Sequence, residues 1–155
     1  AVVDRRADAH QQALLEPLNA YKEQFGDQPI PVDALIEAYA RPIMERHLSC
    51  GNGWRNYTRL MAHLYSESAH LEPKVQVHKY DPVIKQFFAE FRRSMPHANE
   101  PELHWAIYFL RSSVINMLLD TQLVDDQSAG LCDSGDLAQV ITRLKSFFSK
   151  GLQEP

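Results

Sequence analysis

The side chains best suited to chemistry in this chain are its seven histidines and two cysteines. A zinc site needs several nitrogen, sulfur or oxygen ligands whose spacing lets them converge on one point. His63, His70 and His78 do not share one face of a helix, and no carboxylates lie near them at ligand spacing. We therefore interpret them as solvated or singly hydrogen-bonded side chains, and we expect neither a metal nor another cofactor.

Cys50 is the candidate nucleophile, because His47 lies shortly before it. A catalytic thiol also needs a third group that orients its base, and the neighbouring sequence supplies none. The chain has no G-x-S-x-G elbow, no phosphate-binding glycine loop and no H-E-x-x-H helix. Residues 47–50 are better explained as a helix end followed by a glycine-rich turn, and we expect no enzymatic activity.

The segment 103–119 offers the chemistry of a binding pocket. On a helix, one of its faces mixes large rings with small polar groups, as pockets for small molecules do. The residues of this face are Trp105, Phe109, Ser112 and Asn116. Another face is purely apolar and is typical of packing surface. The helix is apolar nearly all round, so nearly all of its sides must be covered. Either it lies at the centre of the domain, or a second subunit covers it.

Arg111 lies among the apolar residues of this same segment. It is either a surface residue whose aliphatic stem covers apolar side chains, or an anchor for the carboxylate of a ligand. The first interpretation is favoured here, because an unpaired charge is seldom buried in a folded protein.

The segment 80–96, YDPVIKQFFAEFRRSMP, adds bulky apolar surface to the predicted pocket. On a helix, its apolar residues gather on one side and its charged residues lie outside. The apolar group comprises Tyr80, Val83, Ile84, Phe87, Phe88, Phe91 and Met95. An aromatic stripe at helical spacing is usually core, so this face either fills the core or walls a cavity.

Helical periodicity predicts six helices, and no segment alternates as a strand does. We expect them at about 1–25, 32–48, 54–65, 80–96, 103–119 and 135–150. Pro42 should kink or reset the second helix. Asn52 and Asn99 are expected N-caps, and Ser134 is expected to begin the last helix. The chain is predicted to be all-α, with residues 1–155 forming a single domain.

Composition narrows the class of protein further. The chain has 155 residues, of which 45% are hydrophobic and 23% charged, as in soluble globular proteins. Its net charge of −4 argues against nucleic acid or an anionic membrane as a direct partner. The two isolated cysteines favour a cytoplasmic protein without a disulfide. The first helix has no start signal before it, so we expect a fragment that lacks an N-terminal partner domain.

Several segments together resemble a known family. They are AVVDRRADAHQQALLEPL, LIEAYARPIM, WRNYTRLMAHLYSES and KYDPVIKQFFAEFRRSMPHANEPELHWAIYFL, followed by the closing amphipathic helix. With these, essentially the whole chain resembles the C-terminal ligand-binding and dimerisation domain of TetR/AcrR-family transcriptional regulators. The resemblance is closest to the subgroup that includes fatty-acid-responsive regulators. The helix-turn-helix of the family would precede Ala1, so DNA would be bound only through that missing domain.

The resemblance implies a homodimer and a ligand pocket. Helices 102–120 and 135–150 would pair with those of a second subunit as a four-helix bundle. The middle helices would enclose a small apolar or amphipathic effector, and helix 1–25 would connect the pocket to the DNA-binding domain. The expected protein is a regulator, with a repressor favoured and no membrane partner. A stand-alone helical lipid carrier and a purely structural dimerisation domain remain as alternatives.

These arguments select two groups of residues. The expected ligand-binding residues are Tyr39, Ile43, Tyr57, Met61, Leu64, Ile84, Phe87, Phe88, Phe91, Trp105, Phe109, Ser112 and Asn116. The expected dimer-interface residues are Leu110, Val114, Met117, Leu118, Leu137, Val140, Ile141, Leu144 and Phe148.

Overall fold

The computed structural model describes residues 2–67 and 81–153. In these residues it contains seven helices and no strand, which confirms the all-α prediction. The helices are α1 (Val2–Phe25), α2 (Val32–Ser49), α3 (Asn52–Glu67), α4 (Asp81–Ser94), α5 (Glu100–Leu119), α6 (Leu123–Gln127) and α7 (Leu137–Gln153). The short helix α6 lies in a segment that was predicted to be a loop. The predictions for His70, His78 and Tyr80 lie outside the described residues.

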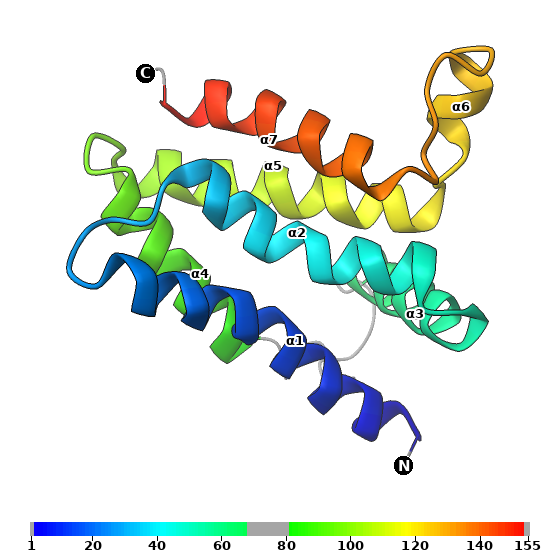
Figure 1. Cartoon of the computed structure of the whole chain (residues 1–155), viewed down its shortest axis with the longest axis horizontal. Helices are drawn as coiled ribbons and strands as arrows, with labels where there is room; N and C mark the ends of the chain where they lie inside the picture. Colours follow the sequence, from blue (N-terminus) through cyan, green and yellow to red (C-terminus); the bar gives the residue numbers. More distant parts are fainter. Residues whose placement is uncertain (1, 68–80, 154–155) are drawn as a thin grey trace.

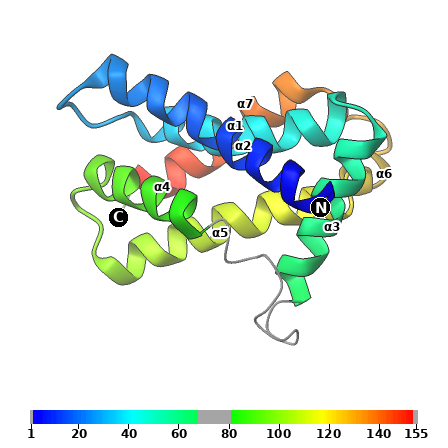
Figure 2. The same cartoon turned by 90° about the horizontal axis from the view of Figure 1, so that it is seen from below.

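Helix α2 is the centre of the fold, whereas the sequence left open whether segment 103–119 is central or is covered by a second subunit. Helix α2 packs against α1, α3, α4, α5 and α7, and its contact with α7 is the most extensive in the molecule. Figure 1 shows α1 and α7 on opposite sides of α2, and Figure 2 shows α5 along one edge of the molecule. Pro42 lies inside α2 and does not reset it, because the helix continues to Ser49; the kink stays a prediction. The ring of Pro42 is half-buried.

Polar side chains mark where several of the helices begin. Asn99 caps α5 as predicted: its side-chain oxygen accepts from the Glu102 N–H at 3.0 Å, and the Glu102 carboxylate accepts from the Asn99 N–H at 2.9 Å. Asn52 is the first residue of α3 and not its cap. The helix α7 begins later than predicted, with the Asp136 carboxylate accepting from the Gln139 N–H at 3.0 Å.

Ser134 was predicted to begin the last helix and instead belongs to the loop before it. Its N–H and its hydroxyl both donate to the Asp125 carboxylate, each at 2.7 Å. Ser134 is buried, so these two bonds fix the loop between α6 and α7 against α6.

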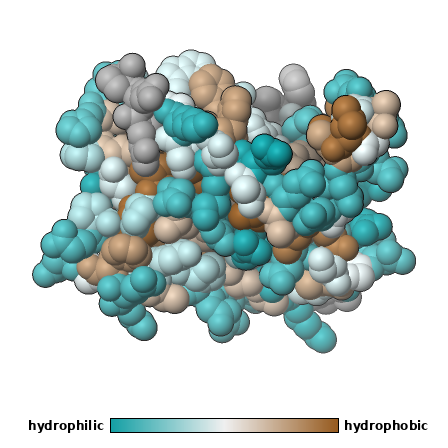
Figure 3. Space-filling view, turned by 45° about the horizontal axis from the view of Figure 1, so that its top comes forward, coloured by the Kyte–Doolittle hydropathy of each residue, from teal (hydrophilic) through white to brown (hydrophobic). Residues whose placement is uncertain are grey.

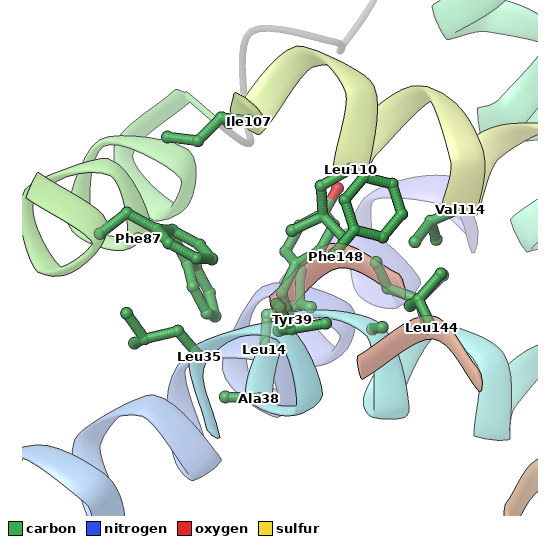
Figure 4. Packing of buried hydrophobic residues seen from close by; sticks show 14 of the residues in the cluster. Leu14, Leu35, Ala38, Tyr39, Phe87, Ile107, Leu110, Val114, Leu144 and Phe148 are labelled. Carbon is green, nitrogen blue, oxygen red and sulfur yellow. The ribbon is translucent and has the colours of Figure 1, made fainter. Parts of the chain in front are cut away.

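The core contains most of the residues predicted for the dimer interface. Figure 4 shows Leu110 and Val114 of α5 and Leu144 and Phe148 of α7 facing the same apolar space above α2. The predicted interface residues that are buried inside the subunit are Leu110, Val114, Leu118, Val140, Ile141, Leu144 and Phe148, while Met117 and Leu137 are half-buried against the same core. The apolar face of α5 therefore packs within its own subunit.

Candidate functional site: an internal cavity and an exposed aromatic face

An internal cavity of about 50 Å³ lies between the first five helices. Most of its wall is apolar, and a few polar groups are set into it. The lining residues are His10 and Leu14 of α1; Tyr39 and Ile43 of α2; Tyr57, Thr58, Met61, Ala62 and Tyr65 of α3; Ile84 of α4; and Arg111, Val114, Ile115 and Leu118 of α5. Walls that are mainly apolar and carry a few polar groups are what binding sites for small molecules have in common.

The structure brings several of the predicted pocket residues together around this cavity. They are Tyr39, Ile43, Tyr57, Met61 and Ile84. They come from three successive helices, α2, α3 and α4, and the helical spacing of the aromatic and apolar side chains was the signal that selected them. Met61 is an unbranched, flexible side chain that can change shape to suit an occupant.

Phe87 and Phe91 do not line the cavity and are fully packed core residues instead. The Phe87 ring meets the Tyr39 ring edge-on, with 5.5 Å between centroids, so it supports the cavity wall from behind. Leu64 and Phe88 are only half-buried and also stay outside the cavity. Phe88 packs against the His104 ring, at 4.5 Å between centroids. The aromatic face of α4 therefore fills core.

Four predicted pocket residues lie on the other side of α5, away from the cavity: Trp105, Phe109, Ser112 and Asn116. Because Leu110 and Val114 turn toward α2, the opposite side of α5 must face outward. Trp105 is 59% exposed and Phe109 53%, and their rings stack at 5.4 Å between centroids. We call the residues Trp105, Tyr108, Phe109, Ser112 and Asn116 the outer α5 face.

A broad surface groove joins the outer α5 face to α7. Its volume is about 1350 Å³, and it lies between Phe109, Ser112 and Asn116 of α5 and a row of α7 residues that includes Arg143 and Phe147. Phe147 is 76% exposed. Contiguous exposed apolar surface of this kind marks interaction sites in soluble proteins.

A second exposed apolar area lies around α6. Figure 3 shows it as the brown patch at the upper right of the molecule. The exposed apolar residues of this region are Leu123, Val124 and Leu131. Small groups of apolar side chains at a surface loop are ordinary, whereas the outer α5 face adds stacked rings to a neighbouring groove. The outer α5 face is therefore the stronger candidate for a partner.

Sequence reasoning missed the part of the cavity wall that α1 supplies. His10 and Leu14 are spaced as neighbours on one helical face, and this spacing was the available signal. His10 is buried, and an Arg46 N–H group lies 3.3 Å from its Nδ1 atom. Burial, together with the positive charge of Arg46, lowers the pKa of His10 from 6.5 to about 4. His10 is consequently neutral at pH 7.

Arg46 ties the cavity wall to the start of α1. It donates to the Ala9 carbonyl oxygen at 3.0 Å. Its guanidinium also lies over the Trp54 ring, 4.4 Å from the centroid, and Arg6 approaches the same ring at 5.3 Å. Cation–π contacts of this kind hold the N-terminal part of α1 against α2 and α3.

Comparison with protein families places this all-α chain in a class of regulatory domain. The chain matches the family described as Tetracyclin repressor-like, C-terminal domain, over residues 37–151. Because the match covers most of the chain, the protein belongs to this family. Domains of the family generally dimerise and bind small-molecule effectors, and they belong to transcriptional regulators.

No match was found among curated proteins or among solved structures. Within the described part of the chain, none of the helices combines the length and the apolar character that a membrane span needs.

Proposed function

We propose that this chain is the effector-binding and dimerisation domain of a cytoplasmic transcriptional repressor that senses a mainly apolar small molecule. The observation that carries the proposal is the internal cavity, which has an apolar wall and includes residues of α1. In a regulator of this family, α1 would connect the cavity to a DNA-binding domain before Ala1. Residues 1–155 would then form one domain.

The cavity residues that belong to α1 suggest how an effector would act on the regulator. An effector that enters the cavity must press on His10 and Leu14, because both residues line it. Arg46 and Trp54 hold the first turns of α1 in one position, through the contacts described above. An effector that favours another position of α1 would relieve repression, whereas equal affinity for both positions would change nothing.

The outer α5 face supports a homodimer. Interfaces of this kind are enriched in aromatic side chains, and α5 presents Trp105, Tyr108 and Phe109 together, beside Phe147 of α7. We propose that this surface, and not the buried face of α5, meets the second subunit. A repressor built this way would set the spacing of two DNA-binding domains through its dimer.

The size of the cavity favours a second candidate, a dimerisation domain without an effector. A cavity that binds benzene has a volume of about 150 Å³, and the present one has about 50 Å³. An effector must therefore move side chains as it enters. Two residues of the wall could move aside: Met61, which has a flexible side chain, and Tyr65, which is half-buried.

Filling the cavity distinguishes the two candidates. Ala62 is buried in the cavity wall, whereas Ala89 of α4 is exposed and outside it. A screen of apolar acids, alcohols and aromatic compounds is read by thermal shift on the wild type, Ala62→Leu and Ala89→Leu. A ligand at a hundredfold excess over its Kd adds about 2.7 kcal/mol of stability. We expect such shifts for the wild type and Ala89→Leu, and smaller ones for Ala62→Leu.

An absence of any shift for the wild type would contradict the effector and leave the structural dimerisation domain. Equal shifts for wild type and Ala62→Leu would show that ligands bind elsewhere than in this cavity. The sequence encoded immediately before Ala1 decides between a regulator and a helical lipid carrier, because only the regulator has a helix-turn-helix there.

A further inference from the structure

Arg111 is a charged residue in an otherwise neutral cavity. It lies half-buried on α5 and lines the cavity beside Tyr39 and Tyr65. Its guanidinium lies over the Tyr65 ring, 5.5 Å from the centroid. Among the described residues, no carboxylate lines the cavity and none lies within ion-pair distance of Arg111. Its partners in the wall are neutral: a hydrogen bond joins its side chain to Tyr39, and the Tyr65 ring lies beneath it. A partly buried charge without a counter-ion is unfavourable, and this points to an anion as the ligand.

The other groups of the wall do not change this balance. His10 is neutral at pH 7 because its pKa is lowered to about 4. Burial raises the pKa of Tyr39, and the nearby positive charge of Arg111 opposes that shift. Tyr39 therefore stays a neutral hydroxyl next to the guanidinium. Among the described residues that line the cavity, Arg111 is the one that is charged at pH 7, and its charge is +1.

Arg111 also stands at the boundary between the cavity and the surface. Arg111, Tyr65 and Ile115 line the internal cavity, and the same three residues line a surface pocket of about 430 Å³ next to Tyr108 and Asn116. The guanidinium therefore faces a surface pocket that borders the outer α5 face, while the apolar wall begins directly behind it. A ligand with one charged end would place that end at Arg111 and its apolar body inward.

We propose that the effector is a monocarboxylate with a compact apolar body. The paired N–H groups of the Arg111 guanidinium, its fork, would bind the carboxylate at the mouth of the cavity. This inference rests on the proposed function, because it names the chemical class of that same effector. A planar carboxylate matches the paired N–H groups of a guanidinium. A phosphate dianion would need more positive charge than the described wall holds. The body would lie among Ile43, Met61 and Val114.

Matched pairs of small molecules test the inference on the wild-type chain. Isothermal titration calorimetry compares hexanoate with 1-hexanol and phenylacetate with 2-phenylethanol, and hexylphosphonate serves as the dianion. We expect each acid to bind at least about tenfold more tightly than its alcohol, because hydrogen bonds to a charged group are the stronger ones. Hexylphosphonate is expected to bind more weakly than hexanoate. This comparison needs no variant, so it does not depend on how a substitution folds.

Variants of Arg111 then assign the effect to its side chain. Arg111→Met should weaken binding of the acids about 10- to 100-fold and leave the alcohols within about twofold. Arg111→Lys keeps the charge but loses the fork, and an intermediate loss is expected. Arg59→Met is the control, because Arg59 is an exposed residue of α3 outside the cavity; it removes the same charge and should leave all affinities unchanged.

The outcomes separate this inference from the function on which it rests. Equal binding of acid and alcohol, tighter binding of the phosphonate, or unchanged acid affinity in Arg111→Met would overturn the carboxylate anchor and leave an apolar effector in place. Failure of these probes while other apolar compounds stabilise the wild type would overturn the anchor alone. Failure of every compound, including the broad screen above, would overturn the effector function itself.

Discussion

His10 belongs to α1, lines the cavity and lies next to the positive charge of Arg46. Its ring lies edge-on to the Tyr57 ring, at 6.0 Å between centroids. Its Nδ1 atom can accept from Arg46 only while it keeps its lone pair. Burial disfavours the charged imidazolium, and the positive charge of Arg46 disfavours it further, so the pKa of His10 falls to about 4. Sequence patterning detects a histidine on a helix face but not the arginine that will lie beside it.

The lowered pKa of His10 predicts a loss of stability in acid. The unfolded chain takes up a proton near pH 6.5 and the folded chain only near pH 4, so the unfolded state binds more protons between these values. Stability is therefore fully present above about pH 6.5 and declines toward pH 4, by on the order of 2–3 kcal/mol for this residue. Urea unfolding at a series of pH values measures the decline.

The variant His10→Gln should make the decline between pH 6.5 and pH 4 shallower. His47, whose pKa burial also lowers to about 4, retains its own contribution in that variant. His97→Gln is the matched control, because His97 is exposed in the turn before α5, and its curve should follow the wild type. A decline in His10→Gln as steep as in the wild type would show that His10 does not cause it.

At the scale of elements, a helix or turn could be predicted from the sequence where the residues that stabilise it are close neighbours in the chain. The helix types, the turn at residues 26–31 and the cap at Asn99 follow from spacing, glycine and proline positions, and side chains within one turn. The start of α7 and the existence of α6 could not be predicted in this way. Ser134 is held by Asp125 and not by α7, and only the folded loop brings these two residues together.

The cap of α5 predicts a measurable difference between two asparagines. Asn99→Ala removes the bond to the Glu102 N–H and should lower the free energy of unfolding by about 1 kcal/mol. Asn52→Ala changes the exposed first residue of α3, where a surface substitution is expected to stay within about 0.5 kcal/mol. Urea denaturation of both variants checks the pair. Equal losses would contradict the assignment of the α5 cap.

The arrangement of the whole molecule depends on contacts that no single helix encodes. The apolar packing face of α5 was recognised from its spacing, but α5 is apolar on nearly all sides, so its pattern could not say whether α2 or a second subunit covers that face. In the structure α5 packs against α3 and α2. Leu144 and Phe148 of α7 face the same apolar space as Leu110 and Val114 (Figure 4). The α5 residues predicted for the pocket therefore lie outside the cavity, and the α5 residues predicted for the dimer lie mostly in the core of the subunit.

Two adjacent phenylalanines of α7 test the resulting dimer. Phe147 is 76% exposed beside the groove of the outer α5 face, whereas Phe148 is 7% exposed and packs in the core. Phe147→Glu should produce a folded monomer, because it places a charge in the proposed interface without disturbing the subunit. Phe148→Glu should unfold the subunit, because it buries an unpaired charge.

Sedimentation gives the mass of each Phe variant at micromolar concentration, and circular dichroism gives its helix content. Trp105→Glu, on the other side of the groove, should reproduce the monomer of Phe147→Glu, because both residues would belong to one surface. The wild type should show a melting temperature that rises with concentration, as dissociating dimers do, and both monomeric variants should lose this dependence. A wild type that sediments as a monomer would remove the homodimer. A Phe147→Glu protein that remains a dimer would show that the second subunit binds elsewhere.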